Sequence, residues 1–128
     1  MKRQHGAVIR QLRSIGFALN GLWTLLRTQQ NAWIHGCASL LAVAFGITLR
    51  ISPHEWLWIL LAITLVWIAE AFNTALEFLA DLVSPEFHPQ VKQAKDIAAG
   101  AVLIAATGAA LIGLIIFLPH LTTVFFKP

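Results

Sequence analysis

A stripe of polar and acidic side chains follows a long apolar run in the middle of the chain. Glu70, Asn73, Glu77 and Asp81 recur at steps of three or four residues, so they share one face if the segment is helical. The preceding run, WLWILLAITLVWIA, contains no charged residue. Such oxygen-bearing side chains suit a hard divalent cation, and a carboxylate deep in a membrane is a candidate general base.

A second charged cluster, containing Lys92, Lys95 and Asp96, follows a short polar connection. If the two flanking segments are antiparallel neighbours, Lys95 and Asp96 lie at about the depth of Glu77, and Glu70 lies deeper. Lysine beside acids suits phosphate. A metal-binding acid, a phosphate-binding cation and a base together outline phosphoryl transfer. The acceptor hydroxyl would then arrive from the lipid side.

Other features of the chain give weaker signals. The glycine signatures G-x-x-x-x-G-K-[ST] and G-x-G-x-x-G are absent, which excludes a soluble-type nucleotide fold. A lone intramembrane glutamate can also be a structural group paired with a neighbouring helix. The stripe opposite a Lys–Asp pair favours a functional site. Among the histidines, His35 falls at the expected inner interface, and His88 is close enough to the acids to be a candidate ligand.

The composition indicates a membrane protein. Of the 128 residues, 58% are hydrophobic and 12% are charged, which is too few charges for the surface of a small soluble domain. A bilayer is spanned by about 20 apolar residues. The sequence contains three such stretches, at about 33–51, 56–79 and 97–118. We therefore expect a single all-α domain over residues 1–128 with three transmembrane helices.

Residues 1–30 are expected to form an amphipathic helix on the membrane surface. Apolar residues at steps of three or four define one face of this helix: Val8, Leu12, Ile15, Leu19, Leu22 and Leu26. Arginines lie on another face, as is typical of a helix in the membrane interface. Lysine and arginine are concentrated before the first span and between the second and third. The positive-inside rule therefore places the N-terminus and the second loop in the cytoplasm. The net charge of +3 concerns topology and anionic lipid, and does not indicate nucleic acid.

Two further features concern helix ends and helix packing. Pro53 is expected to end the first span, because the residue before a proline disfavours the helical region. The third span carries small residues at four-residue intervals, a pattern that lets membrane helices approach closely: Ala101, Ala105, Ala109 and Gly113. Three such helices make a thin bundle, so a homo-oligomer would supply missing walls.

The segment AEAFNTALEFLADLVSPEFHPQVKQAKDIAAGAVLIAA resembles the signature of the small prokaryotic membrane lipid kinases. These are the bacterial diacylglycerol kinases and the similar undecaprenol kinases. The pattern E-x-x-N-[ST]-A-[IL]-E-x-x-x-D, followed by H and A-K-D, carries the resemblance, which covers nearly the whole chain. It implies a homotrimer of three-span subunits in the bacterial cytoplasmic (inner) membrane. Such a protein uses Mg²⁺ with ATP at composite sites between subunits.

The resemblance also implies roles for individual residues. Glu70 falls on the general base that takes the proton from the lipid hydroxyl, Glu77 on a magnesium and nucleotide ligand, and Asn73 on the polar residue between them at the substrate. Further positions fall on residues at the nucleotide: Arg10 (also tied to the lipid substrate), Phe17, Glu86, Phe87, His88, Lys95 and Asp96.

Gln29 is the main departure from the family pattern. The family has a metal-binding glutamate eight residues after the glycine matched by Gly21, where this chain has Gln29. A glutamine oxygen coordinates magnesium without adding charge, so metal affinity could be lower, one ion could be held, or ATP phosphates could supply most ligands. A catalytically impaired family member is a further alternative. A small membrane transporter with Glu70 as its proton or cation site is the alternative from another class.

The lipid substrate is left open between undecaprenol and diacylglycerol. The segments from Asn31 to His35 and from Phe17 to Gly21 look more like the undecaprenol kinase branch. Both alcohols present a primary hydroxyl at the membrane interface, so the fold alone does not choose between them.

Overall fold

The protein is seen here in a computed structural model that describes the backbone of residues 2–125 and the side chains of residues 10–123. The ends of the expected 1–128 domain and the side chain of Val8 lie outside the described set. The described residues form four helices and no strand, so the all-α prediction is confirmed: α1 (Lys2–Thr28), α2 (Gln30–Thr48), α3 (Pro53–Val83) and α4 (Pro89–Phe125).

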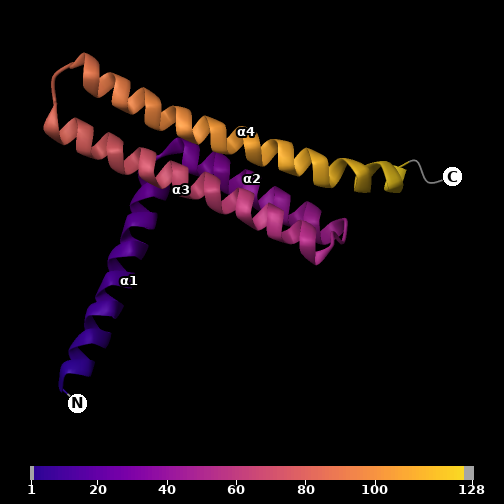
Figure 1. Ribbon diagram of the computed structural model, residues 1–128, viewed down its shortest axis with the longest axis horizontal. Helices are drawn as coiled ribbons and strands as arrows, with labels where there is room; N and C mark the ends of the chain where they lie inside the picture. Colours follow the sequence, from indigo (N-terminus) through magenta and orange to yellow (C-terminus); the bar gives the residue numbers. More distant parts are fainter. Residues whose placement is uncertain (1, 126–128) are drawn as a thin grey trace.

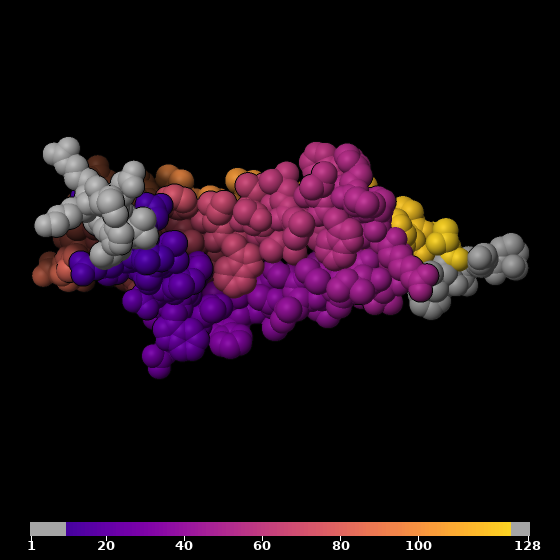
Figure 2. Space-filling model, turned by 90° about the horizontal axis from the view of Figure 1, so that it is seen from below, coloured from indigo at the N-terminus to yellow at the C-terminus, as the bar shows by residue number. Residues whose placement is uncertain are grey.

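The helices α3 and α4 lie side by side and antiparallel, and α2 packs along the first part of α3 (Figure 1). The helix α1 meets the others near its C-terminal end, and its N-terminal half stands away from them. Seen from below, α2 and α3 form the middle of the visible face, with α1 toward one end and the yellow end of α4 at the other (Figure 2). This arrangement makes an elongated bundle rather than a compact globule.

Among the described residues, three helices are long and apolar enough to cross a membrane, as predicted: Gln30–Thr48, Pro53–Val83 and Pro89–Thr123. A helix satisfies its own backbone hydrogen bonds, which the hydrocarbon core requires. The 31 residues of α3 reach roughly 46 Å, well beyond the ~30 Å hydrocarbon core. The helices α3 and α4 extend past the predicted spans at both ends, whereas α2 is shifted about three residues toward the N-terminus relative to its predicted span. The end of α3 with Glu77 and Asp81 therefore has room to leave the hydrocarbon.

The prediction that Pro53 ends the first span is wrong. The helix α2 ends at Thr48, and the chain reverses at Arg50, whose φ of 52° is left-handed. Ser52 then caps α3: its hydroxyl accepts from the Glu55 N–H, and the Glu55 carboxylate accepts from the Ser52 N–H. Pro53 is the first residue of α3, where its missing N–H costs nothing.

The hydrophobic core lies at this turn, at the far end of α3 from the acidic residues. Ile51, Ile59 and Ile116 are buried together, with Trp56 and Phe117 packed against them. The indole of Trp56 lies so close to Gly46 that a Cβ there would be 2.7 Å from its nearest atom. The turn, the start of α3 and the end of α4 are thus held together by apolar packing.

Candidate active site

The polar stripe of α3 changes from buried to exposed along the helix. Glu70 is completely buried, and Asn73 is 5% exposed. Glu77 is half-buried and its carboxylate oxygen Oε1 accepts a hydrogen bond of 3.1 Å from the Asn73 amide Nδ2. Asp81, one turn further, is exposed. The stripe therefore leads from the interior of the bundle to the end of α3 near the second loop.

Four buried polar atoms in this region have no hydrogen-bond partner among the described residues: both carboxylate oxygens of Glu70, Oδ1 of Asn73 and Oγ1 of Thr74. A buried carboxylate without hydrogen bonds is strongly unfavourable. Such a group is rarely kept for stability alone, and in a membrane helix it indicates a functional site.

His35 of α2 comes close to Glu70 from the neighbouring helix. Its Nε2 lies 3.7 Å from Oε2 of Glu70. The backbone of α2 is fixed at this point, because the Ser39 hydroxyl donates to the His35 carbonyl oxygen at 2.7 Å and accepts from Trp67 Nε1 at 3.2 Å. The sequence reasoning placed His35 at the interface and gave it no role. No spacing or motif links it to Glu70, and only a comparison of depths in two helices could have suggested the pair.

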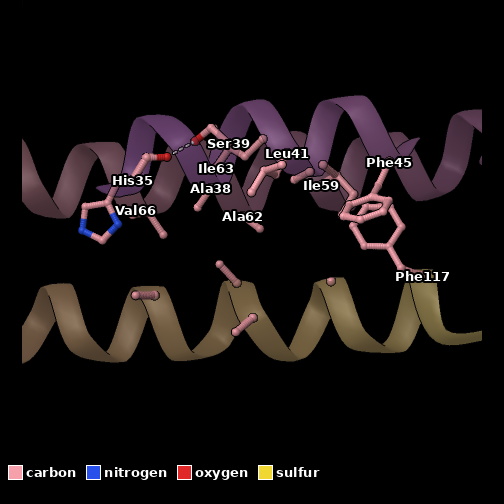
Figure 3. A pocket seen from close by; sticks show the side chains of 15 residues that line it. His35, Ala38, Ser39, Leu41, Phe45, Ile59, Ala62, Ile63, Val66 and Phe117 are labelled. Carbon is pink, nitrogen blue, oxygen red and sulfur yellow. Dashed lines mark hydrogen bonds between the residues drawn. The ribbon is translucent and has the colours of Figure 1, made fainter. Parts of the chain in front are cut away.

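Two hollows meet at His35. A polar recess of about 280 Å³ is lined by Asn31, His35, Asn73 and Glu77, together with small and apolar residues of α4. A groove of about 360 Å³ runs from His35 along α2, α3 and α4 toward Phe45 and Phe117, and is lined almost entirely by apolar side chains (Figure 3). The small residues of α4 help to form its wall, among them Ala109 and Gly113 of the predicted ridge. The recess with the polar residues and the apolar groove thus share His35 and Ala106 in their linings.

The charges at the loop end pair differently from the expected arrangement. Lys95 Nζ donates to Asp81 Oδ1 at 2.9 Å, one helical turn nearer the loop than Glu77. Asp96 accepts from Lys92 at 2.6 Å on the exposed side of α4. The sequence predicts Lys95 and Asp96 at about the depth of Glu77, whereas the direct partner of Lys95 is Asp81 and that of Asp96 is Lys92.

The remaining candidate residues are not gathered around Glu70 within one chain. Glu86, Phe87 and His88 lie exposed in the loop between α3 and α4. Arg10 and Phe17 are exposed on α1, with Phe17 at 73%, and neither lines the recess of Asn73 and Glu77.

A metal ion would find few protein ligands in one chain. Within the described residues, no group of three His, Cys, Asp or Glu side chains could hold a metal ion. Gln29 is half-buried and precedes α2 in an extended conformation, with no capping hydrogen bond from its side chain. The half-buried Glu77 carboxylate fits the hard-oxygen chemistry of magnesium, which typically takes one or two carboxylates and completes its shell with water and substrate phosphates.

Comparison with known families decides which class of protein carries this arrangement. The family described as prokaryotic diacylglycerol kinase matches residues 16–117. The chain belongs to this family. An undecaprenol kinase of Bacillus subtilis is 39% identical over 112 residues, which cover 88% of this chain and 91% of that protein.

Two relatives named diacylglycerol kinase are also similar to the chain. The protein from Synechocystis is 37% identical over 111 residues, covering 86% of this chain and 63% of that protein. The protein from Escherichia coli is 30% identical over 118 residues, covering 87% and 91%. The chain is therefore an enzyme of the lipid kinase class, which implies a nucleotide substrate and a membrane location, with a divalent metal generally expected.

Proposed function

We propose that this protein transfers the γ-phosphate of ATP to the hydroxyl of a membrane lipid alcohol and releases the lipid phosphate and ADP. The observation that carries the proposal is Glu70, a fully buried carboxylate without a hydrogen-bond partner among the described residues. It begins a stripe that continues through Asn73 and Glu77 to the charged loop end. The phosphate donor comes from water and the acceptor from lipid, and this stripe joins the two environments.

Each part of the site is assigned a role in the transfer. Glu70 is the general base for the lipid hydroxyl, and Asn73 orients Glu77 through their hydrogen bond. Lys95 and Asp96 hold the nucleotide, and Glu77 is the protein ligand for Mg²⁺. When bound, the metal would neutralise charge on the phosphates, and those phosphates would supply the negative charge that Gln29 does not bring to the site. Glu86, Phe87 and His88 border the nucleotide from the loop.

The lipid acceptor that we propose is undecaprenol. The segment from Asn31 to His35, which contributes Asn31 and His35 to the recess, resembles the undecaprenol kinase branch. The relative named undecaprenol kinase is 39% identical to this chain. Diacylglycerol is the alternative acceptor, since two similar relatives carry that name.

The membrane arrangement and assembly complete the proposal. The N-terminus and the second loop face the cytoplasm, where ATP is available. The apolar side chains of α1, including Leu12, Ile15 and Leu19, are exposed in one chain and would lie in the inner-membrane interface. Arg10 and Phe17 do not line the recess of Asn73 and Glu77, and we propose that the other chains of a homotrimer bring these residues to the nucleotide.

Lipid-stimulated ATP consumption tests this function against a transporter that uses Glu70. Wild-type protein in vesicles should convert ATP to ADP in equal amount to the lipid phosphate formed. Glu70→Gln should reduce turnover by about 10²–10⁴-fold, the usual contribution of a general base, while MgATP binding is retained. Ion or drug flux without formation of lipid phosphate would overturn the proposed kinase function. Near-normal turnover of the Glu70→Gln variant would overturn the role of Glu70 as the base.

A further inference from the structure

The position of His35 raises the question of how a proton reaches Glu70. Glu70 is fully buried and lines neither the polar recess nor the apolar groove, whereas His35 lines both. The side chain of His35 is 15% exposed, against 1% for Glu70. In Figure 3 its imidazole points into the space between α2 and α4. A lipid hydroxyl in the groove therefore meets His35 before it meets Glu70.

We infer that His35 is a further catalytic residue, which takes the proton from the lipid hydroxyl and passes it to Glu70. Its Nε2 faces Oε2 of Glu70 at 3.7 Å, and neither ring nitrogen makes a hydrogen bond within the described residues. Nδ1 is thus available to the hydroxyl. Neutral imidazole has one protonated nitrogen and one acceptor, which is the property a proton shuttle needs. This inference rests on the proposed kinase function.

Phosphoryl transfer to the lipid breaks one P–O bond, forms another and moves one proton. The lipid oxygen forms a bond to the γ-phosphorus while the bond from that phosphorus to the bridging oxygen of ADP breaks, and ADP leaves with the electron pair. The hydroxyl proton goes to Nδ1 of His35, and the proton on Nε2 goes to Glu70. Both groups end neutral, which suits a site removed from water. Glu70 is reset when its proton returns through the same imidazole to the polar recess.

The surrounding structure positions the backbone of His35 close to Glu70. The hydrogen bonds from Trp67 to Ser39 and from Ser39 to the His35 carbonyl tie α2 to α3 one turn from Glu70. Gly36 lies against the Trp67 ring, where a Cβ would be 3.8 Å from its nearest atom. The separation of His35 and Glu70 is thus set by contacts between two helices rather than by a flexible loop.

The chain offers a matched control for this pair. His120 Nε2 lies 3.7 Å from Oε2 of Glu55, at the opposite end of α3. The two pairs have the same residue types and the same separation, but the His120 pair lies by the α2–α3 turn, away from the recess and groove residues that surround His35. The His120 pair is more exposed, and His120 Nδ1 also lies 2.9 Å from the Ile116 carbonyl oxygen, so this variant controls for the loss of a histidine beside a glutamate and not for its burial.

Steady-state kinetics of His35→Gln and His120→Gln in vesicles with MgATP and undecaprenol test the inference. Glutamine keeps a polar side chain of similar reach but cannot shuttle a proton. We expect His35→Gln to lower kcat by at least about 100-fold with the KM for ATP unchanged, and His120→Gln to be fully active. In parallel, added imidazole should restore turnover to His35→Ala in a saturable way and should not restore it to Glu70→Gln.

The outcomes separate this inference from the proposed function. Near-normal kcat in His35→Gln, with Glu70→Gln inactive, would overturn the role of His35 and leave the kinase intact. Failure of imidazole to stimulate His35→Ala would also overturn the role of His35. If His35→Gln does not assemble, the imidazole experiment alone tests this role. Absence of lipid phosphate from the wild-type protein would instead overturn the proposed function.

Discussion

At the scale of single residues, the proposed function depends on a carboxylate, Glu70, that is buried at a cost in free energy. A buried, unpaired Glu70 lowers the stability of the bundle, and the gain must come from the reaction it supports. The residues toward the loop are progressively more exposed and are paired, as Asp81 is with Lys95. The buried Glu70 lies where a lipid substrate would enter from the membrane. The charged residues near the loop lie where ATP would enter from water.

Lys95→Ala should raise the KM for ATP by about 10-fold or more, because it removes a hydrogen bond from a charged group to the nucleotide, worth about 1.5–3 kcal/mol. The KM for the lipid should change much less. The variant also breaks the 2.9 Å ion pair with Asp81. Asp81→Asn is the control, because it removes the same ion pair and leaves the cation. If both variants raise the KM for ATP equally, or if the lipid KM changes more, Lys95 does not contact the nucleotide.

Gln29→Glu should lower the Mg²⁺ concentration needed for half-maximal turnover, because it adds a charged oxygen ligand. About 10-fold is expected from one charge-assisted contact. A titration of Mg²⁺ at fixed ATP measures the change, with the adjacent Gln30→Glu as control. A large rise in kcat as well would show that the natural protein is catalytically impaired. An unchanged titration would show that position 29 does not contribute to the metal site.

The sequence predicts the polar face of α3 that contains Glu70, but it does not predict that His35 of α2 lies beside Glu70. The spacing of Glu70, Asn73 and Glu77 within one helix predicts a shared face, and they share it. His35 comes from a different helix, and its approach depends on how α2 and α3 pack, which spacing does not encode. The same limit explains Lys95, whose partner Asp81 depends on the register between α3 and α4.

At the scale of helices, apolar stretches predict the number of spans better than their ends. Hydropathy marks the segments that suit lipid, but helices continue until the backbone meets a specific stop signal. The chain leaves α2 through the left-handed residue Arg50, and α3 begins at the capping box formed by Ser52 and Glu55. These signals are local and do not depend on hydropathy, so the loop lies at residues 49–52 rather than between the predicted spans, and Pro53 begins α3 instead of ending the first span.

Gly46→Ala should destabilise the turn between α2 and α3, because its Cβ would lie 2.7 Å from the Trp56 indole. Overpacking of this kind costs about 1–3 kcal/mol. Thermal unfolding in detergent measures the loss, with Gly108→Ala as the matched control, since no atom lies within 4 Å of a Cβ there. Equal melting temperatures for the two variants would contradict the proposed packing.

At the scale of the whole molecule, the proposed site draws on residues that the described part of one chain does not bring to a single recess. Among its described residues no cluster of three ligating side chains could hold a metal, and Arg10 and Phe17 lie outside the recess. The native mass of the detergent-solubilised protein should therefore correspond to three copies of the 14.1 kDa chain. Multi-angle light scattering with correction for detergent checks this. A monomer with full activity would contradict the need for a second chain.

The most direct test of the central claim is transfer of radiolabelled phosphate from MgATP in membranes that contain the protein. Undecaprenol and diacylglycerol should be offered separately, and the lipid products should be separated by chromatography. We predict labelled undecaprenyl phosphate in the wild-type sample and none with Glu70→Gln. Labelled product from diacylglycerol alone would keep the kinase and change its substrate. No labelled lipid from either alcohol, with a folded protein in the membrane, would contradict the account.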